Sequence, residues 1–90
     1  MKHLNIRVLG IVQGIGYRHS ARSAARFNNI KGFARNESDG SVYIEAEGEA
    51  ESLRKFTDWC RKGPGGGRVD ELVISEGGMR GFESFEIKFI

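Results

Sequence analysis

Along the chain, stretches whose apolar residues have the spacing of a strand alternate with stretches that have the spacing of a helix. This order of stretches limits the possible folds more than any other feature. Leu4, Ile6 and Val8 alternate with polar residues, as in a half-buried strand that runs to about Ile11. Between His19 and about Asn28, alanines recur on one face of an expected helix. The first part of the chain therefore predicts a strand, a loop and a helix that packs closely on a sheet.

The second part of the chain continues with further strands and one more helix. Asp39-Gly40 lies between two strand-like runs, and this pair is a strong signal for a β-hairpin turn. Gly63-Pro64 ends a stretch whose apolar residues recur at helical spacing. The elements expected after the first helix are strands at 31–36 and 42–47, a helix from about 49 to 62, and strands at 68–75 and 85–89.

This order, β-α-β-β-α-β with an extra terminal strand, predicts the ferredoxin-like split βαβ fold of the α+β class. We expect an antiparallel sheet with two helices packed on one face, in a single domain over residues 1–90. A crossover through the first helix makes the strand at 31–36 parallel to the first strand. Both strands then end at the same edge of the sheet, with one strand between them, or roughly 10 Å apart. The loop at residues 13–18 and Asn36 should therefore meet there.

Composition excludes several classes of protein. With 39% hydrophobic residues, 29% charged residues and a net charge of +2, the chain is typical of a globular domain and carries no clustered basic patch for nucleic acid. It contains no apolar run that would serve as a membrane span or a signal peptide. One cysteine and two distant histidines offer neither a disulfide nor a metal site, so we expect a cytoplasmic protein without a metal or another cofactor. We also expect a monomer.

The segment at residues 13–18 joins the first strand to the start of the first helix. Its backbone N–H groups are free to converge on an anion, and the helix dipole favours negative charge there. Glycines within it let the backbone approach a ligand closely. A plain glycine turn is the alternative, and the segment lacks both the Gly-Lys-Ser/Thr ending of a nucleotide P-loop and the third glycine of a dinucleotide site. We expect an anion-binding cradle here, formed by the backbone N–H groups of Gln13, Gly14, Ile15, Gly16, Tyr17 and Arg18.

Arg18 stands where the first helix begins. A guanidinium group binds two phosphate oxygens at once and keeps its charge at any working pH, which suits a phosphoryl group. Most arginines on small domains are solvated surface residues, and the neighbouring glycine loop is what favours an anion-binding role for this one.

Two stretches of the chain resemble the signatures of the acylphosphatase family. The first is GIVQGIGYR at residues 10–18 and the second is GFARNESDGSV at residues 32–42, and the likeness extends over about residues 4–89. The resemblance implies an enzyme that hydrolyses an acyl phosphate, a small molecule, to a carboxylate and inorganic phosphate. It also implies that Arg18 and the loop N–H groups hold the phosphate and that Asn36 positions the attacking water.

The implied chemistry needs few parts. An acyl phosphate is an activated anhydride with a good leaving group, so phosphoryl transfer chiefly requires positioning and charge stabilisation. The amide of Asn36 orients a water but accepts no proton at neutral pH, which leaves the substrate's own phosphate oxygen as the expected proton acceptor. Inorganic phosphate, the product, is expected to inhibit. Two departures from the family pattern, Tyr17 for phenylalanine and Ala34 for valine, leave both key side chains in place.

Other polar residues have structural explanations. We expect His3 and His19 to face outward and Cys60 to pack within the apolar stripe of the second helix. We expect Glu45 and Glu47 to lie on a solvated face of their strand rather than to bind a metal.

Two alternatives remain open. The RNA-recognition fold has the same order of elements, and KGFA at residues 31–34 matches the opening of its aromatic strand motif. However, this stretch lies on the second strand instead of the third and continues with Arg35-Asn36-Glu37 instead of aromatic residues. The other alternative is a catalytically idle relative that binds phosphorylated metabolites, although the presence of both Arg18 and Asn36 favours turnover.

Overall fold

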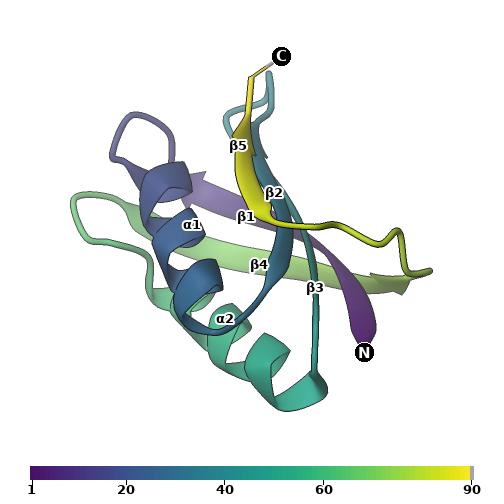
Figure 1. Ribbon diagram of the computed structural model, residues 1–90. Helices are drawn as coiled ribbons and strands as arrows, with labels where there is room; N and C mark the ends of the chain where they lie inside the picture. Colours follow the sequence, from purple (N-terminus) through teal and green to yellow (C-terminus); the bar gives the residue numbers. More distant parts are fainter. Residues whose placement is uncertain (90) are drawn as a thin grey trace.

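Two helices cover one face of a five-stranded sheet in the computed structural model, which describes residues 1–89 (Figure 1). The elements are β1 (Lys2–Ile11), α1 (Tyr17–Phe27), β2 (Lys31–Asn36), β3 (Val42–Gly48), α2 (Ala50–Lys62), β4 (Arg68–Gly77) and β5 (Phe85–Lys88). The expected order of strands and helices is confirmed. Within residues 1–89, no helix is both long enough and apolar enough to cross a membrane.

The strands lie in the order β4-β1-β3-β2-β5. The first four pair antiparallel, and β3 lies between β1 and β2 as expected. The expectation of a wholly antiparallel sheet is wrong for β5, which pairs in parallel with β2. The reason is the connection before it: residues 78–84 carry the chain from β4 at one edge of the sheet to the opposite edge, where β5 runs in the direction of β2.

Local interactions define both ends of α1. The helix begins at Tyr17, two residues before the expected start, and this places Arg18 in its first turn. At the other end Asn29 adopts the left-handed conformation, with φ of 59°. The N–H group of Ile30 donates to the carbonyl of Ala25 at 2.8 Å, which closes a Schellman-type C-terminus.

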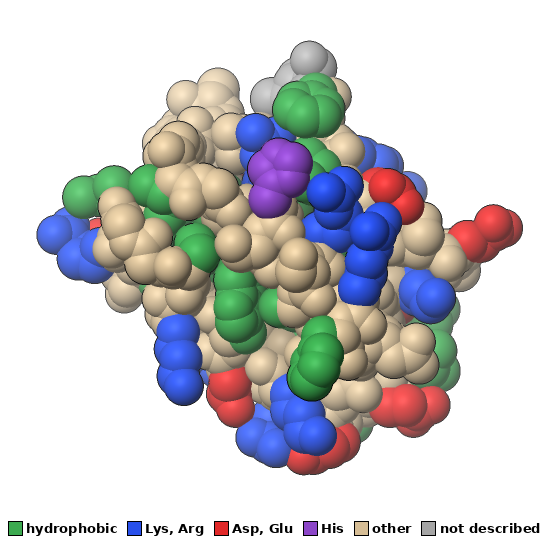
Figure 2. All heavy atoms as spheres, turned by 60° about the vertical axis from the view of Figure 1, so that its left-hand side comes forward, with side chains coloured by type: hydrophobic (Ala, Val, Ile, Leu, Met, Phe, Trp, Pro, Cys, Tyr) green, Lys and Arg blue, Asp and Glu red, His purple; other side chains and the backbone are tan. Residues whose placement is uncertain are grey.

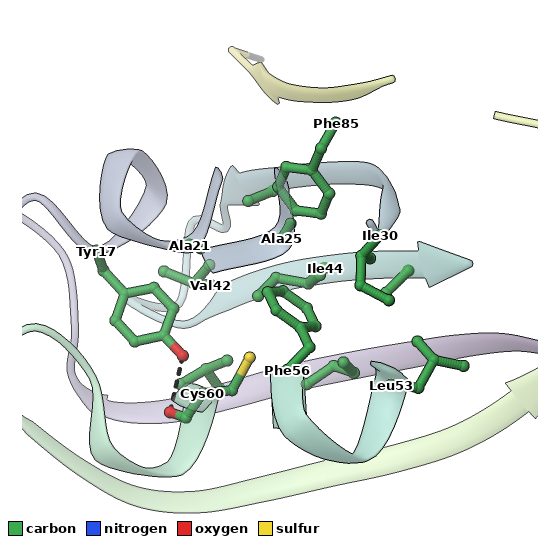
Figure 3. Packing of buried hydrophobic residues seen from close by; sticks show 14 of the residues in the cluster. Tyr17, Ala21, Ala25, Ile30, Val42, Ile44, Leu53, Phe56, Cys60 and Phe85 are labelled. Atoms are coloured by element: carbon green, nitrogen blue, oxygen red, sulfur yellow. Dashed lines mark hydrogen bonds between the residues drawn. The ribbon is translucent and has the colours of Figure 1, made fainter. Parts of the chain in front are cut away.

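The core lies between the helices and the sheet, and Figure 3 shows side chains from both helices meeting there. Ala21 and Ala25 have no exposed surface, which lets α1 approach the sheet closely. Tyr17 points into the same core and its hydroxyl donates a hydrogen bond to the backbone carbonyl of Cys60 at 2.9 Å (Figure 3). The packing role expected for Cys60 is confirmed, because the residue has no exposed surface and belongs to the core cluster. Burial also raises the pKa of its thiol to about 12.

The outer face of the sheet differs from the expectation. His3 lies on the outer face as expected, but His3 and Glu47 are only 3% and 1% exposed and Glu45 is buried as well, so the expectation of solvated carboxylates is wrong. The segment 78–84, which we call the strap, covers this face. The Glu47 carboxylate accepts hydrogen bonds from three backbone N–H groups of the strap at 2.6–3.1 Å and lies 2.7 Å from the His3 ring. Strand alternation correctly assigns these residues to the outer face, but it does not reveal that another segment covers that face.

The pKa values of the His3–Glu47 pair shift in opposite directions. Burial alone would lower the pKa of His3, but its contacts with Glu47, Asn5 and Glu45 raise it above 6.5. Burial alone would raise the pKa of Glu47, but the N–H groups of the strap and the His3 ring lower it below 4.5. A histidine whose pKa is raised by folding stabilises the folded state at low pH, and this stability is lost as the pH rises through the folded-state pKa. A carboxyl group whose pKa is lowered by folding stabilises the folded state at higher pH, and this stability is lost as the pH falls through the folded-state pKa.

We therefore expect the contribution of this pair to the free energy of unfolding to be greatest between pH 4.5 and pH 6.5. Urea unfolding measured from acidic to alkaline pH tests this. His3→Gln should flatten the decline above pH 6.5, and Glu47→Gln should flatten the decline on the acid side. A His3→Gln variant that keeps the parent slope above neutral pH would show that protonation of His3 is not linked to folding.

Candidate functional site

The loop between β1 and α1 leaves a row of backbone N–H groups without partners. Gly14 and Gly16 have φ of 78° and 79°, a conformation that other residues rarely adopt. A Cβ atom added at either glycine would meet no atom within 4 Å, so the loop is open on that side. No hydrogen bond joins the backbone N–H groups of residues 13–19 to an acceptor elsewhere in residues 1–89. A helix N-terminus with free N–H groups is a favourable place for an anion.

The side chain of Gln13 ties this loop to the hairpin that follows β2. Its Nε2 atom donates to the carbonyl oxygens of Glu37 at 2.8 Å and Ser41 at 2.9 Å. The loop and the end of β2 therefore meet, as the topology predicted. The sequence indicated a role only for the backbone N–H group of Gln13, and the role of its amide as a bridge was missed.

Asn36 is the last residue of β2 and is half-buried. Asn36 pairs with Val42 of β3, and Val42 pairs with Val8 of β1. One strand, β3, therefore separates Asn36 from β1. Ala34, two residues earlier, has no exposed surface and belongs to the core under the helices. Because alternate residues of a strand share a face, Asn36 also lies on the helix side of the sheet, the side of α1.

The guanidinium group of Arg18 lies at the same corner. Its Nη1 atom is 3.5 Å from the carbonyl oxygen of Lys88, and its Cζ atom lies 4.9 Å from the centre of the Phe89 ring. Lys88 pairs with Arg35, the residue before Asn36, so β5 brings the guanidinium next to the end of β2. The sequence missed this contact with β5 because the two segments lie at opposite ends of the chain.

The start of α1 lacks the features that usually stabilise the N-terminus of a helix. A basic residue in the first turn faces the positive end of the helix dipole, and the first turn contains Arg18 but no acidic residue. The N-cap residue is Gly16, which makes no side-chain hydrogen bond to the helix. The basic residue, the absence of an acidic residue and the glycine N-cap all lower the stability of the isolated helix, and all three favour binding of an external anion. Such local conflicts are typical of functional sites.

Other parts of the chain offer weaker candidates. Phe33, the aromatic residue of the RNA-like stretch, is 3% exposed and packs edge-on against Phe82 at 5.8 Å, so it presents no face on which a base could stack. A hollow of about 210 Å³ lined by Leu4, Leu53 and Ile74 lies at the beginning of β1, whereas the loop follows its end. In the part of the chain that the structure describes, no group of three or more His, Cys, Asp or Glu residues is arranged to hold a metal ion.

The chain is similar to known proteins along nearly its whole length. The profile of the family described as Acylphosphatase matches residues 4–87. Two relatives named acylphosphatase, from Thermotoga petrophila and Thermotoga maritima, are each 44% identical over 89 residues, which cover 99% of this chain and 99% of the relative. The crystal structure of acylphosphatase from Bacillus subtilis superposes with a TM-score of 0.95 at 30% identity and covers 98% of this chain and 99% of that one.

Proposed function

Because this chain belongs to the acylphosphatase family of hydrolases, we propose that its active site is the corner formed by the loop after β1, Arg18 and Asn36. The observation that carries this proposal is the row of unpaired N–H groups at residues 13–19, with the Arg18 guanidinium beside it. Together they supply several hydrogen-bond donors and one positive charge, which match the three non-bridging oxygens of a phosphoryl group.

In this proposal Arg18 and the loop hold the phosphoryl group and stabilise the charge that develops during transfer. The present contact of Arg18 with the Lys88 carbonyl is long, at 3.5 Å, and such a weak hydrogen bond leaves the guanidinium free to turn toward a phosphate. The Gln13 bridge to Glu37 and Ser41 supports the geometry, because it fixes the loop relative to the end of β2.

Asn36 has the second role in the proposal. Its amide accepts a hydrogen bond from a water molecule and thereby orients that water toward phosphorus. The water oxygen forms a bond to phosphorus while the bond from phosphorus to the carboxylate oxygen breaks. The proton of the water passes to a phosphate oxygen of the substrate, and the products are a carboxylate and inorganic phosphate.

Hydrolysis of benzoyl phosphate by the purified protein tests the proposed function directly. We expect its ultraviolet absorbance to fall as benzoate forms, and we expect the rate to survive exhaustive treatment with a chelator. The reason is that positioning and charge stabilisation by the protein suffice for an activated anhydride. Activity that disappears on chelation and returns only with added magnesium or zinc would contradict a metal-independent mechanism.

Inorganic phosphate is expected to inhibit competitively, because the product occupies the same cradle as the phosphoryl end of the substrate. Phosphate should also raise the melting temperature, since a ligand that binds only the folded state stabilises it. Unchanged kinetics at phosphate concentrations tens of times above the apparent KM would argue against an anion site in this loop.

We further propose that the protein acts as a monomer in the cytoplasm. Support for the compartment comes from Cys60, a single buried thiol that forms no disulfide. Sedimentation of the purified chain tests the oligomeric state, and fractionation of cells that produce it tests the location.

A further inference from the structure

A second cationic group lies one helical turn beyond the proposed active site. Arg18, Arg22 and Arg26 are spaced four residues apart on α1 and therefore share one face of the helix. Figure 2 shows the side of the molecule on which α1 lies, where arginine and lysine side chains gather next to a histidine. Arg26 is already engaged, because its Nη2 atom lies 3.3 Å from the carbonyl oxygen of Phe85 and 3.8 Å from the Glu86 carboxylate. By contrast, no carboxylate of residues 1–89 lies within 4.0 Å of the guanidinium of Arg18 or Arg22.

The Arg22 side chain leans toward the N-terminus of α1. Its Nη2 atom lies 3.5 Å from Nδ1 of His19, the residue that follows Arg18. This direction agrees with the general lean of helical side chains toward the helix N-terminus. Four residues advance a helix by about 6 Å, so the backbone of Arg22 lies about one turn beyond that of Arg18.

We propose that Arg22 forms a second anion subsite and makes this enzyme prefer acyl phosphates whose acyl group ends in a carboxylate or a phosphate. This inference rests on the proposed function. The cradle grips the phosphoryl end, and no atom lies within 4 Å of a Cβ added at Gly14 or Gly16, so the loop itself does not crowd a bound acyl phosphate there. A short carbon chain then spans the distance of about one helical turn between the two arginines. A neutral acyl group of the same length gains no contact of this kind.

Binding of non-hydrolysable analogues separates the subsite from turnover. The probes are 5-phosphonopentanoate, which carries a terminal carboxylate, and pentylphosphonate, which has the same chain length and no carboxylate. Calorimetric titration of the parent protein should show about three- to fivefold tighter binding of the first, the range for an exposed ion pair. Arg22→Gln should bring the ratio of the two dissociation constants close to one. Arg26→Gln is the matched control, because it removes the same charge from the same helix and should keep the parent ratio.

The inference is overturned if the parent protein shows no preference, or if both variants lower the ratio equally, since a diffuse positive field would then suffice. The ratio of kcat/KM for succinyl phosphate over butyryl phosphate should follow the same pattern across the three proteins. If neither acyl phosphate is hydrolysed but the binding ratio depends on Arg22, the proposed hydrolysis fails while the subsite stands.

Discussion

Arg18→Ala is expected to lower kcat/KM for benzoyl phosphate by about a thousandfold, the upper range for loss of one well-placed donor in a transition state. The loss should be this large because no other arginine or lysine side chain is assigned to the phosphoryl group. The same substitution should leave stability unchanged or slightly improved, because it removes a positive charge from the first turn of α1. Stopped-flow or steady-state kinetics and thermal unfolding of the same preparation measure both effects.

Two further variants make the prediction about Arg18 specific. Arg18→Lys should recover little activity, because an ammonium group cannot bind two phosphate oxygens with the geometry of a guanidinium. Arg26→Ala, on the same helix face, should keep nearly the parent rate. Near-parent activity in Arg18→Lys would show that a point charge is sufficient and that the proposed two-pronged contact is wrong.

Asn36→Ala is expected to lower kcat by about a hundredfold or more while leaving the inhibition constant of phosphate nearly unchanged. The two effects should separate because the amide is proposed to hold the water, whereas the loop and Arg18 hold the phosphate. Steady-state kinetics with phosphate as a competitive inhibitor give both quantities.

A purely structural role for Asn36 predicts a different outcome. The residue ends β2 just before the hairpin, so its loss could weaken the fold without touching the reaction. Asn28→Ala supplies a control, because it removes a side-chain hydrogen bond to the Ala24 carbonyl at the far end of α1 and should cost only stability. If Asn36→Ala behaves like this control, with a lower melting temperature and a parent rate per folded molecule, the water-positioning role is refuted.

The features that the sequence predicted correctly depend on interactions between neighbours along the chain. The hairpin at Asp39 is an example: its Oδ1 atom accepts hydrogen bonds from the N–H group and the hydroxyl of Ser41, two residues away. The hydroxyl contact is the main reason that the pKa of Asp39 is lowered. The phosphate cradle, which stays a prediction, is local in the same sense, because its N–H groups and Arg18 come from one continuous segment.

The position of Asn36 required one further step. The chain topology predicted that β2 would end beside the loop, since a crossover helix makes two strands parallel. That prediction is borne out by the hydrogen bonds of Gln13 to Glu37 and Ser41, although no sequence pattern indicated that this particular amide would make them. The sequence thus determined which elements form and which edge of the sheet they share.

Only the tertiary structure decided what covers the outer face and what surrounds Arg18. Alternation in β1 and β3 indicates that His3 and Glu47 share a face, but their burial depends on the strap, whose N–H groups come from residues more than thirty positions away from Glu47. In the same way, the contact of Arg18 with Lys88 follows from the parallel pairing of β5 with β2. Local patterns specify the direction in which a side chain points. They do not specify which distant segment lies there, because that choice depends on the packing of the whole chain.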